Sequence, residues 1–332
     1  MRLRSLLGAA LAGGAAIALR RSFTAKEKPP EEPRRRRQSR LADALDPSRD
    51  IPLKAPVPPA LPRGSLANVP ERGEMFYRHA GDPTAGTPVL LLHGWMASAD
   101  LNWWPVYEGL AAEHPLIAPD HRGHGRGIRS VFEFTLEDCA EDAAALLRHL
   151  GIARAVVVGY SMGGPIATLL WRRHPELVAG LVLEATALEW SSGRWERWRW
   201  NLMGLVGGLL RYPTGRLILA RLIGGRTEVP EPLKPHRSWI DGEFRRNDPG
   251  DLAEAGRALG RYDARSFFEG VDTPIAVVVT TRDSLVPADK QRELARATNA
   301  KVFDFNGDHD SAIVQGPEFA RVTLDAIEAV TS

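Results

Sequence analysis

Ser161 lies between two glycines at the junction of a predicted strand and a predicted helix. The apolar run Ala-Val-Val-Val at 155–158 directly precedes the pentapeptide Gly-Tyr-Ser-Met-Gly at 159–163. A short apolar run of this kind predicts a buried strand, so the chain must turn very tightly to enter the helix. The turn strains the serine backbone and leaves no room for side chains two positions away, which explains Gly159 and Gly163. It also lifts the Ser161 hydroxyl clear of the sheet.

Predicted strands and helices alternate from about residue 65 to the end of the chain. We expect strands at 88–92, 115–118, 155–158, 181–183, 275–279 and 302–305, and helices at 101–112, 136–150, 162–174 and 317–330. Several of these strands are apolar throughout, as in parallel sheets that helices cover on both faces. The order predicts an α/β fold with a mostly parallel central sheet.

The alternation is interrupted between about 188 and 262. This stretch has no buried-strand pattern, and it carries Trp190, Trp195, Trp198, Trp200 and Trp239. We expect a helical cap over the carboxyl ends of the strands, where open α/β folds bind ligands. The tryptophans line an apolar substrate pocket, or they anchor the cap to the core, or with nearby arginines they suit a membrane headgroup layer. The cap would separate a first part of the core at 65–187 from a second part at 263–332.

The positive charge of the chain is concentrated in a tail at 1–64. The 332 residues have a formal net charge of +2, but the tail holds 14 Lys and Arg against 6 Asp and Glu. The tail therefore carries +8 and the remainder −6, so the fold itself is not basic and we expect no nucleic-acid partner. Many prolines and scattered charges at 29–63 predict a linker without a core of its own.

The tail begins with two arginines, followed by an uncharged run at 5–19 and another arginine pair. This run falls short of the roughly 20 residues that span a bilayer. A signal peptide would be followed by a cleavage site and few charges, whereas four consecutive arginines occur at 34–37. Such charges hold the following domain in the cytoplasm. We therefore expect a cytoplasmic protein, peripheral on the inner membrane face through anionic lipid contact at 1–37; a membrane-anchored or exported protein is the alternative.

The sequence predicts neither a metal site nor a cofactor. Cys139 is the single cysteine, which excludes an intramolecular disulfide, and its acidic neighbours in a predicted helix disfavour a thiolate. No Cys and His cluster has zinc-site spacing, and no phosphate-binding loop occurs. Two histidines at 120–125, in Asp-His-Arg-Gly-His-Gly, resemble metal ligands. A sharp glycine-rich turn after a strand explains them better.

A serine hydroxyl is a weak nucleophile and needs a histidine base that a carboxylate orients. When a serine occupies a strand-to-helix turn of this type, the acid and then the histidine follow it in the chain. Three histidines follow Ser161, namely His174, His236 and His309. His309 follows the last predicted strand, at the carboxyl end of the sheet, and is the expected base. His174 belongs to the helix after the serine, and His236 to the Pro-rich part of the predicted cap.

The expected acid is Asp283, which follows the strand at 275–279 and so lies at the same edge of the sheet as His309. Glu184, at the end of the preceding strand, is the alternative. Asp308 and Asp310 flank His309. We expect them to structure its loop and to favour the imidazolium electrostatically.

Two backbone N–H groups should hold the oxyanion of an acyl-transfer reaction. One is Met162 N–H, directly after the serine, and the second should come from the loop after an early strand. His93-Gly94-Trp95 fits this loop, because Gly94 permits close backbone approach and Trp95 N–H would point at the oxyanion. His93 is expected to hold the loop in shape.

Together these motifs resemble the α/β-hydrolase fold, and within it the lidded serine hydrolases of the esterase and lipase-like kind. The matching elements are His-Gly-Trp at 93–95, the turn at 120–125, Gly-Tyr-Ser-Met-Gly-Gly at 159–164, Asp283 and His309. The resemblance covers about residues 65–332, and the basic tail departs from the family pattern.

The resemblance implies a serine hydrolase that cleaves a carboxylic ester through an acyl-enzyme intermediate, with Ser161, Asp283 and His309 as its triad. The predicted cap indicates an apolar acyl group and a small-molecule or lipid-like ester substrate. Alternatives on the same fold are hydrolysis of a lactone, an amide or a carbon–carbon bond, and perhydrolysis. A non-catalytic binding protein is the alternative of a different class.

Overall fold

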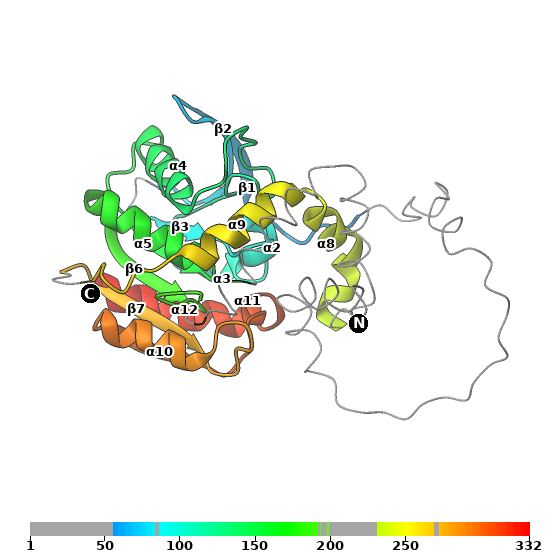
Figure 1. Ribbon diagram of the computed structural model, residues 1–332. Coiled ribbons are helices and arrows are strands. Elements are labelled where there is room, and N and C mark those ends of the chain that lie inside the picture. The colour runs from blue at the N-terminus through cyan, green and yellow to red at the C-terminus, as the bar shows by residue number, and fades with distance from the viewer. Residues whose placement is uncertain (1–55, 84–85, 192, 194–197, 199–230, 269–271) are drawn as a thin grey trace, which may run out of the picture.

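The computed structural model describes residues 56–83, 86–191, 193, 198, 231–268 and 272–332. Its strands form one sheet in the order β1-β2-β4-β3-β5-β6-β7-β8 (Figure 1). They are β1 (Arg63–Val69), β2 (Gly73–Ala80), β3 (Val89–Leu92), β4 (Leu116–Pro119), β5 (Ala155–Tyr160), β6 (Val178–Glu184), β7 (Ile275–Thr280) and β8 (Lys301–Phe305). β2 pairs antiparallel with β1 and β4, and every other neighbouring pair is parallel. The predicted fold class is confirmed.

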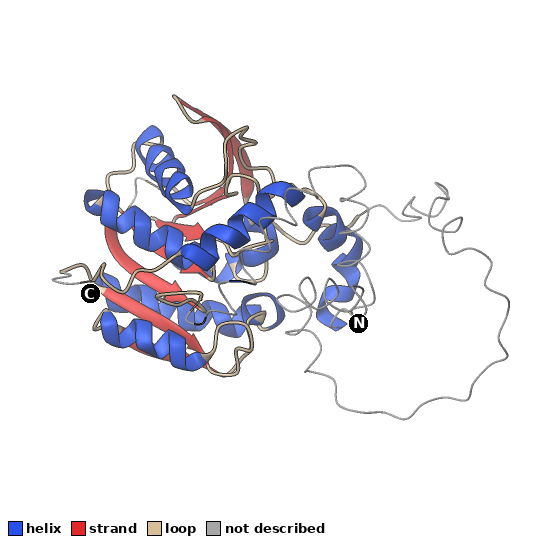
Figure 2. Ribbon diagram, viewed as in Figure 1, coloured by secondary structure: helices blue, strands red, loops and turns tan. Residues whose placement is uncertain are grey.

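Helices connect the strands and cover both faces of the sheet (Figure 2). In the described residues they are α2 (Ala99–Trp103), α3 (Tyr107–Glu113), α4 (Leu136–His149), α5 (Gly163–Arg173), α8 (Arg237–Phe244), α9 (Pro249–Arg261), α10 (Ala288–Ala297), α11 (Ser311–Val314) and α12 (Gly316–Thr331), with 3₁₀ turns η2 (Pro175–Leu177) and η3 (Glu231–His236).

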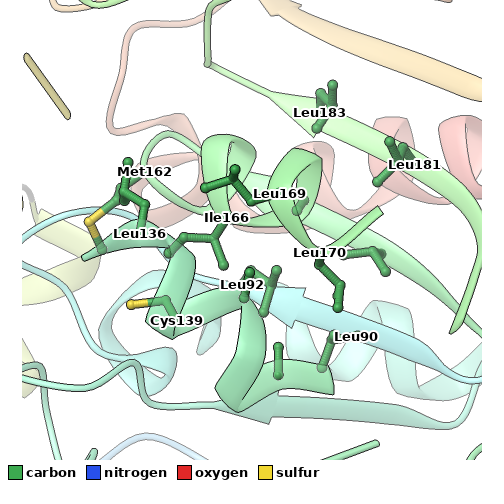
Figure 3. Packing of buried hydrophobic residues seen from close by; sticks show 14 of the residues in the cluster. Leu90, Leu92, Leu136, Cys139, Met162, Ile166, Leu169, Leu170, Leu181 and Leu183 are labelled. Carbon is green, nitrogen blue, oxygen red and sulfur yellow. The ribbon is translucent and has the colours of Figure 1, made fainter. Parts of the chain in front are cut away.

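The side chains of each central strand alternate between two hydrophobic clusters. In β3, Leu90 and Leu92 belong to the cluster that includes α4 and α5, whereas Val89 and Leu91 belong to the cluster that includes α3 and α12. Figure 3 shows part of the first cluster. All four leucine and valine side chains of β3 are fully buried, as expected for a strand covered on both faces.

Two features of the sheet and its helices differ from the prediction. Strands β1 and β2 were not predicted. They form an antiparallel edge of the sheet whose residues are only partly buried, so their sequences lack a continuous apolar run. β1 begins at Arg63, inside the predicted tail. The predicted helix at 101–112 is two helices, α2 and α3, because Pro105 between them lacks the N–H that a continuous helix requires.

The predicted tail and cap fall largely on residues that the structure does not describe. The proposed membrane contact at 1–37 lies wholly outside the described residues. Within 188–262, the described residues include η3, α8 and α9; residues 192, 194–197 and 199–230 lie outside, Trp195 and Trp200 among them. Among the described residues, no helix is long and apolar enough to cross a membrane.

A buried carboxylate on α4 connects the β1–β2 turn to the turn at 120–125. Asp142 Oδ1 accepts from Arg72 Nε at 2.6 Å, and Asp142 Oδ2 accepts from Arg122 Nε at 2.7 Å. The side chain of Asp142 is 6% exposed. Two guanidinium groups therefore share one carboxylate that water hardly reaches.

Replacing this carboxylate should destabilise the fold much more than replacing its exposed neighbour. Asp142→Ala removes the buried carboxylate that Arg72 and Arg122 share and leaves them only the more exposed Asp138, so we expect the free energy of unfolding to fall by about 3–5 kcal/mol. Glu141→Ala removes more exposed pairs with Arg173 and His174 and should cost about 1 kcal/mol or less. Urea denaturation of both variants measures the difference, and equal losses would contradict a special role for Asp142.

Candidate active site

Ser161 lies between β5 and α5 with its backbone in the left-handed region, at φ +54°. That conformation costs a non-glycine residue about 1–3 kcal/mol. The Ser161 N–H donates to Glu184 O at 2.9 Å, which holds the turn against β6. A Cβ at Gly159 would collide with Gly163 O, and a Cβ at Gly163 would collide with Leu92 O. The two glycines therefore let helix α5 start in contact with strands β3 and β5.

The structure brings Ser161, His309 and Asp283 together from three separate strand ends. His309 Nε2 lies 3.0 Å from Ser161 Oγ, and His309 Nδ1 lies 2.8 Å from Asp283 Oδ2. Because a carboxylate only accepts hydrogen bonds, Nδ1 carries the proton and Nε2 presents its lone pair to the serine hydroxyl. The Asp283 side chain is fully buried, and the His309 side chain is 16% exposed. This arrangement can move a proton away from Ser161 Oγ.

The Asp283 carboxylate is fixed in place by groups that the sequence argument missed. Its Oδ1 accepts from Leu285 N at 2.9 Å and Val286 N at 2.8 Å. Its Oδ2 also accepts from the Thr280 hydroxyl at 2.8 Å, and Gln291 Nε2 donates to Thr280 Oγ1 at 2.9 Å. The acid is thus held in one orientation from the end of β7 and from α10. No local pattern in the sequence connects Gln291 to this role.

The His309 loop is held by two contacts of different kinds. Asp308 Oδ1 accepts from His309 N at 2.7 Å and from Ser284 N at 3.0 Å, so this aspartate structures the loop. Tyr160 Oη donates to His309 O at 2.7 Å. The tyrosine immediately before the serine therefore fixes the backbone of the histidine.

The loop after β3 lies directly against Ser161. A Cβ built on Gly94 would be 3.3 Å from Ser161 Cβ, so only glycine allows this approach without displacement. Gly94 N donates to Asn102 Oδ1 at 2.9 Å, which anchors the loop to α2. Met162 lies at the N-cap of α5, where N–H groups have no acceptor within the helix. The two backbone segments expected to hold an oxyanion thus flank the serine.

The turn at 120–125 is a structural support rather than a set of open metal ligands. Asp120 accepts from Ala99 N and Arg126 N, both at 2.7 Å. The rings of His93 and His121 lie 4.2 Å apart. Burial lowers the pKa of His121 to about 3 and that of His124 to about 4, which keeps both rings neutral. No group of three or more His, Cys, Asp or Glu suited to a metal ion occurs in the described residues.

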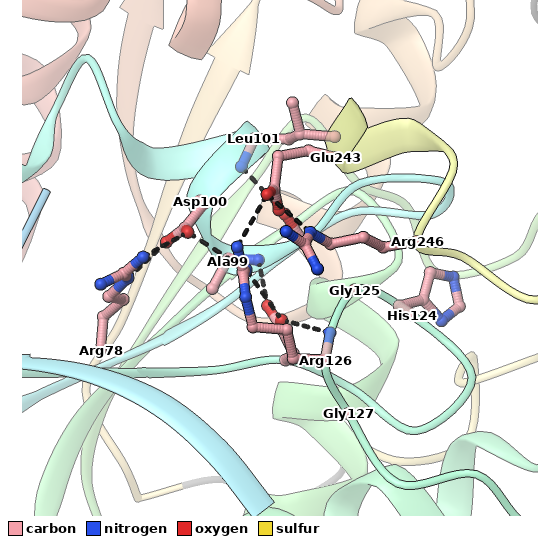
Figure 4. Close-up of polar contacts among 12 residues, drawn as sticks. Arg78, Ala99, Asp100, Leu101, His124, Gly125, Arg126, Gly127, Glu243 and Arg246 are labelled. Carbon is pink, nitrogen blue, oxygen red and sulfur yellow. Dashed lines mark hydrogen bonds and ion pairs between the residues drawn. The ribbon is translucent and has the colours of Figure 1, made fainter. Parts of the chain in front are cut away.

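An arginine joins this turn to two other segments. Arg126 donates from Nη1 to Asp100 Oδ2 at 3.2 Å and from Nη2 to Glu243 Oε1 at 2.7 Å. Figure 4 shows it between the two carboxylates. α2, the 120–125 turn and α8 are therefore held together next to the loop after β3.

The other candidates from the sequence make different contacts. His174 ends α5 and bonds Glu141, while His236 bonds Val57 O. The carboxyl of Glu184 accepts from the Thr323 hydroxyl at 2.7 Å, and His309 Nδ1 has Asp283 as its partner. Burial raises the pKa of the Cys139 thiol well above its ordinary value, which disfavours a thiolate.

Comparison with known proteins identifies the family. Residues 87–316 match the model of the alpha/beta hydrolase fold family, and the chain belongs to this family. It is 41% identical over 215 residues to the dihydrolipoyllysine-residue acetyltransferase component of the acetoin cleaving system of Pseudomonas putida, covering 63% of this chain and 55% of that protein. The chain thus spans about half the length of that relative.

Two further proteins are similar over most of this chain. Pimeloyl–acyl-carrier protein methyl ester esterase of Sodalis glossinidius is 29% identical over 236 residues, which cover 69% of this chain and 88% of that protein. The crystal structure of an enol-lactonase from Burkholderia xenovorans LB400 has a TM-score of 0.68 at 24% identity, covering 80% of this chain and 100% of that chain. The second likeness shows the shared fold.

The buried carboxyl of Glu184 makes the stability of the fold depend on pH. Burial raises its pKa from 4.5 to about 8. The folded state favours the neutral form of Glu184. The contribution of this carboxyl to the free energy of unfolding is therefore complete below about pH 4.5 and is lost as pH rises through about 8. Glu184→Gln stays neutral and keeps an acceptor for Thr323. We expect it to melt at a higher temperature than the wild type at pH 8–9, and at a similar temperature at pH 5.

Thermal melting of both proteins from pH 5 to 9 measures this effect. The change in the free energy of unfolding is at most ~1.4 kcal/mol for each unit of pKa shift. Glu328→Gln, on the exposed side of α12, is the matched control and should follow the wild type. Parallel melting curves for Glu184→Gln and the wild type would show that Glu184 has no such effect.

Proposed function

We propose that this chain is a serine hydrolase that cleaves carboxylic esters through an acyl-enzyme intermediate. The observation that carries the proposal is the continuous set of contacts from Ser161 Oγ to His309 Nε2, 3.0 Å, and from His309 Nδ1 to Asp283 Oδ2, 2.8 Å. Similarity to a methyl ester esterase over 69% of the chain supports an ester as the substrate. No metal or cofactor enters the proposed reaction.

In the first step, His309 Nε2 takes the proton of Ser161 Oγ as the oxygen attacks the ester carbonyl carbon. The carbonyl electron pair moves onto its oxygen, and the imidazolium then gives its proton to the departing alkoxide as the ester C–O bond breaks. Asp283 holds the ring in the required tautomer and stabilises the imidazolium. In the second step, a water loses its proton to His309 as it attacks the acyl carbonyl carbon. The bond from that carbon to Ser161 Oγ then breaks, the proton passes from His309 to Ser161 Oγ, and the carboxylic acid leaves.

The proposed oxyanion donors are Trp95 N–H and Met162 N–H. Their support is the close approach of Gly94 to Ser161 and the N-cap position of Met162. Losing one such donor typically costs ~2.7–4 kcal/mol of transition-state stabilisation. Because both donors are backbone groups, their alignment depends on how the loop and the turn are held.

For the substrate we propose a small-molecule or lipid-like ester with an apolar acyl group, bound under a helical cap at 188–262. The support is the tryptophan content of this stretch. In the described residues Trp190 and Trp239 are buried, and the Trp239 ring lies 6.1 Å from that of Trp104, which favours an anchoring role for these two. Lactone hydrolysis is the second candidate, because a lactone is an ester closed into a ring and the enol-lactonase shares the fold.

The nucleophile assignment predicts covalent labelling at one residue. A fluorophosphonate probe should label the wild-type protein, and Ser161→Ala should abolish labelling and lower ester hydrolysis by on the order of 10⁴–10⁶ in kcat. Gel fluorescence of the probe and hydrolysis of p-nitrophenyl butyrate measure the two effects.

Ser65→Ala, in edge strand β1, is the control and should be labelled like the wild type. Labelling that survives Ser161→Ala would overturn the nucleophile assignment. A correctly folded wild type that takes no label would instead favour a non-catalytic binding protein.

The apolar-pocket proposal predicts a dependence on acyl length. Each buried CH₂ contributes ~0.8 kcal/mol when it enters an apolar site, so kcat/KM should rise by up to several-fold per added methylene from p-nitrophenyl acetate until the pocket is filled. Initial rates for acetate, butyrate, hexanoate and decanoate esters measure this series. Equal kcat/KM values across the series would argue against an apolar acyl site.

A further inference from the structure

The segment that joins α8 to α9 forms hydrogen bonds with the loop after β3, which is expected to hold the oxyanion. Asn247 is 6% exposed, and both ends of its side-chain amide are used. Nδ2 donates to Met96 O at 2.9 Å, and Oδ1 accepts from Gly125 N at 2.7 Å. Since a backbone carbonyl only accepts and a backbone N–H only donates, this pair of partners fixes the orientation of the amide.

A second contact holds the neighbouring residue of the same loop. Trp95 Nε1 donates to Leu252 O, on α9, at 2.7 Å. Asp248 N donates to Gly123 O at 3.1 Å, so the segment is also fixed to the turn at 120–125. Two consecutive loop residues, Trp95 and Met96, are thus attached to residues more than 150 positions away in the chain.

The loop needs such support because its own conformation is strained. Met96 has φ +65°, a left-handed conformation that costs a non-glycine residue about 1–3 kcal/mol. Within the loop, Ala97 N donates to Gly94 O at 3.4 Å, at the long end of the hydrogen-bond range. Asn102 holds only the Gly94 end. The Met96 end is held by Asn247 and, one residue earlier, by the contact of Trp95 with Leu252.

We propose that Asn247 is a positioning residue that keeps Trp95 N–H aimed at the oxyanion by holding the carbonyl of Met96. The proposal rests on the proposed function of Ser161 and Trp95. It couples the oxyanion loop to the α8–α9 segment: any movement of that segment also moves a donor of the active site. Asn247 touches no reacting atom and acts only through the loop.

Asn247→Ala should reduce kcat with little change in KM. Misplacing a catalytic group by about 1 Å costs up to ~10²-fold, and complete loss of one donor costs ~10²–10³-fold, so we expect a 10- to 100-fold fall in kcat for p-nitrophenyl butyrate. KM should stay within about threefold, since the oxyanion forms only in the transition state. The inhibition constant of a trifluoromethyl ketone, which forms an oxyanion on the serine, should rise by the same factor as kcat/KM falls.

Asn247→Asp separates the two contacts of the amide. It retains an acceptor for Gly125 N but loses the donor to Met96 O, so it should match or exceed the defect of Asn247→Ala. Glu254→Ala is the matched control, because Glu254 Oε2, on α9, accepts from Phe134 N at 2.8 Å, and Phe134 lies outside the oxyanion loop. This control should keep the wild-type kcat and inhibitor affinity.

The outcomes distinguish this proposal from the one on which it rests. If Ser161→Ala is inactive while Asn247→Ala keeps the wild-type kcat and inhibitor affinity, the positioning role is wrong and the nucleophile stands. If Glu254→Ala loses as much kcat and inhibitor affinity as Asn247→Ala, the effect comes from anchoring of α9 in general, and the positioning role of Asn247 is wrong. If Asn247→Ala does not fold, as judged by circular dichroism, Trp95→Phe removes the other tie and must show the same fall in kcat with KM unchanged.

Discussion

The close approach of β3, β5 and α5 at Gly163 is the constraint on which the site depends. Helix α5 can begin in contact with Leu92 O only because Gly163 has no side chain, and Gly159 allows the strand to meet the helix. Ser161 is the first of the two residues between β5 and α5, and its φ is +54°. The strain there is offset by the burial of β5 and α5 in two hydrophobic clusters. The serine is therefore presented by packing, not by a mobile loop.

Parallel strand order accounts for the rest of the arrangement. β3, β5, β7 and β8 run in the same direction, so the segments that follow them emerge at one edge of the sheet. Gly94, Ser161, Asp283 and His309 come after these four strands in turn. Ser161 and His309, 148 positions apart, can then meet within hydrogen-bonding distance without any long-range sequence signal. The same logic places Asp283, after β7, beside His309, after β8.

This strand logic made much of the fold and the candidate site predictable, because buried parallel strands are continuously apolar and their last residues are identifiable. It fails where burial is one-sided or where contacts depend on loop paths. β1 and β2 lie at the partly exposed edge of the sheet and carry no such run. Thr280 and Gln291 support Asp283 through side-chain geometry that no spacing reveals. Asn247 meets Met96 only because the α8–α9 segment lies against the loops that follow β3 and β4.

The ionisable groups packed around the strand ends are either neutral or paired with an opposite charge. Burial lowers the pKa of His121 and His124 and raises that of Glu184 to about 8, so all three are uncharged at neutral pH. Arg122 forms an ion pair with Asp142, and Arg126 forms ion pairs with Asp100 and Glu243. Ser161 is linked by hydrogen bonds to the Asp283–His309 pair, at a buried position with little water to screen charge. In the proposed reaction, fixed backbone N–H groups need no reorganisation when charge develops, so the hold that Asn247 and Asn102 exert on a short backbone loop would matter as much as the identity of the side chains.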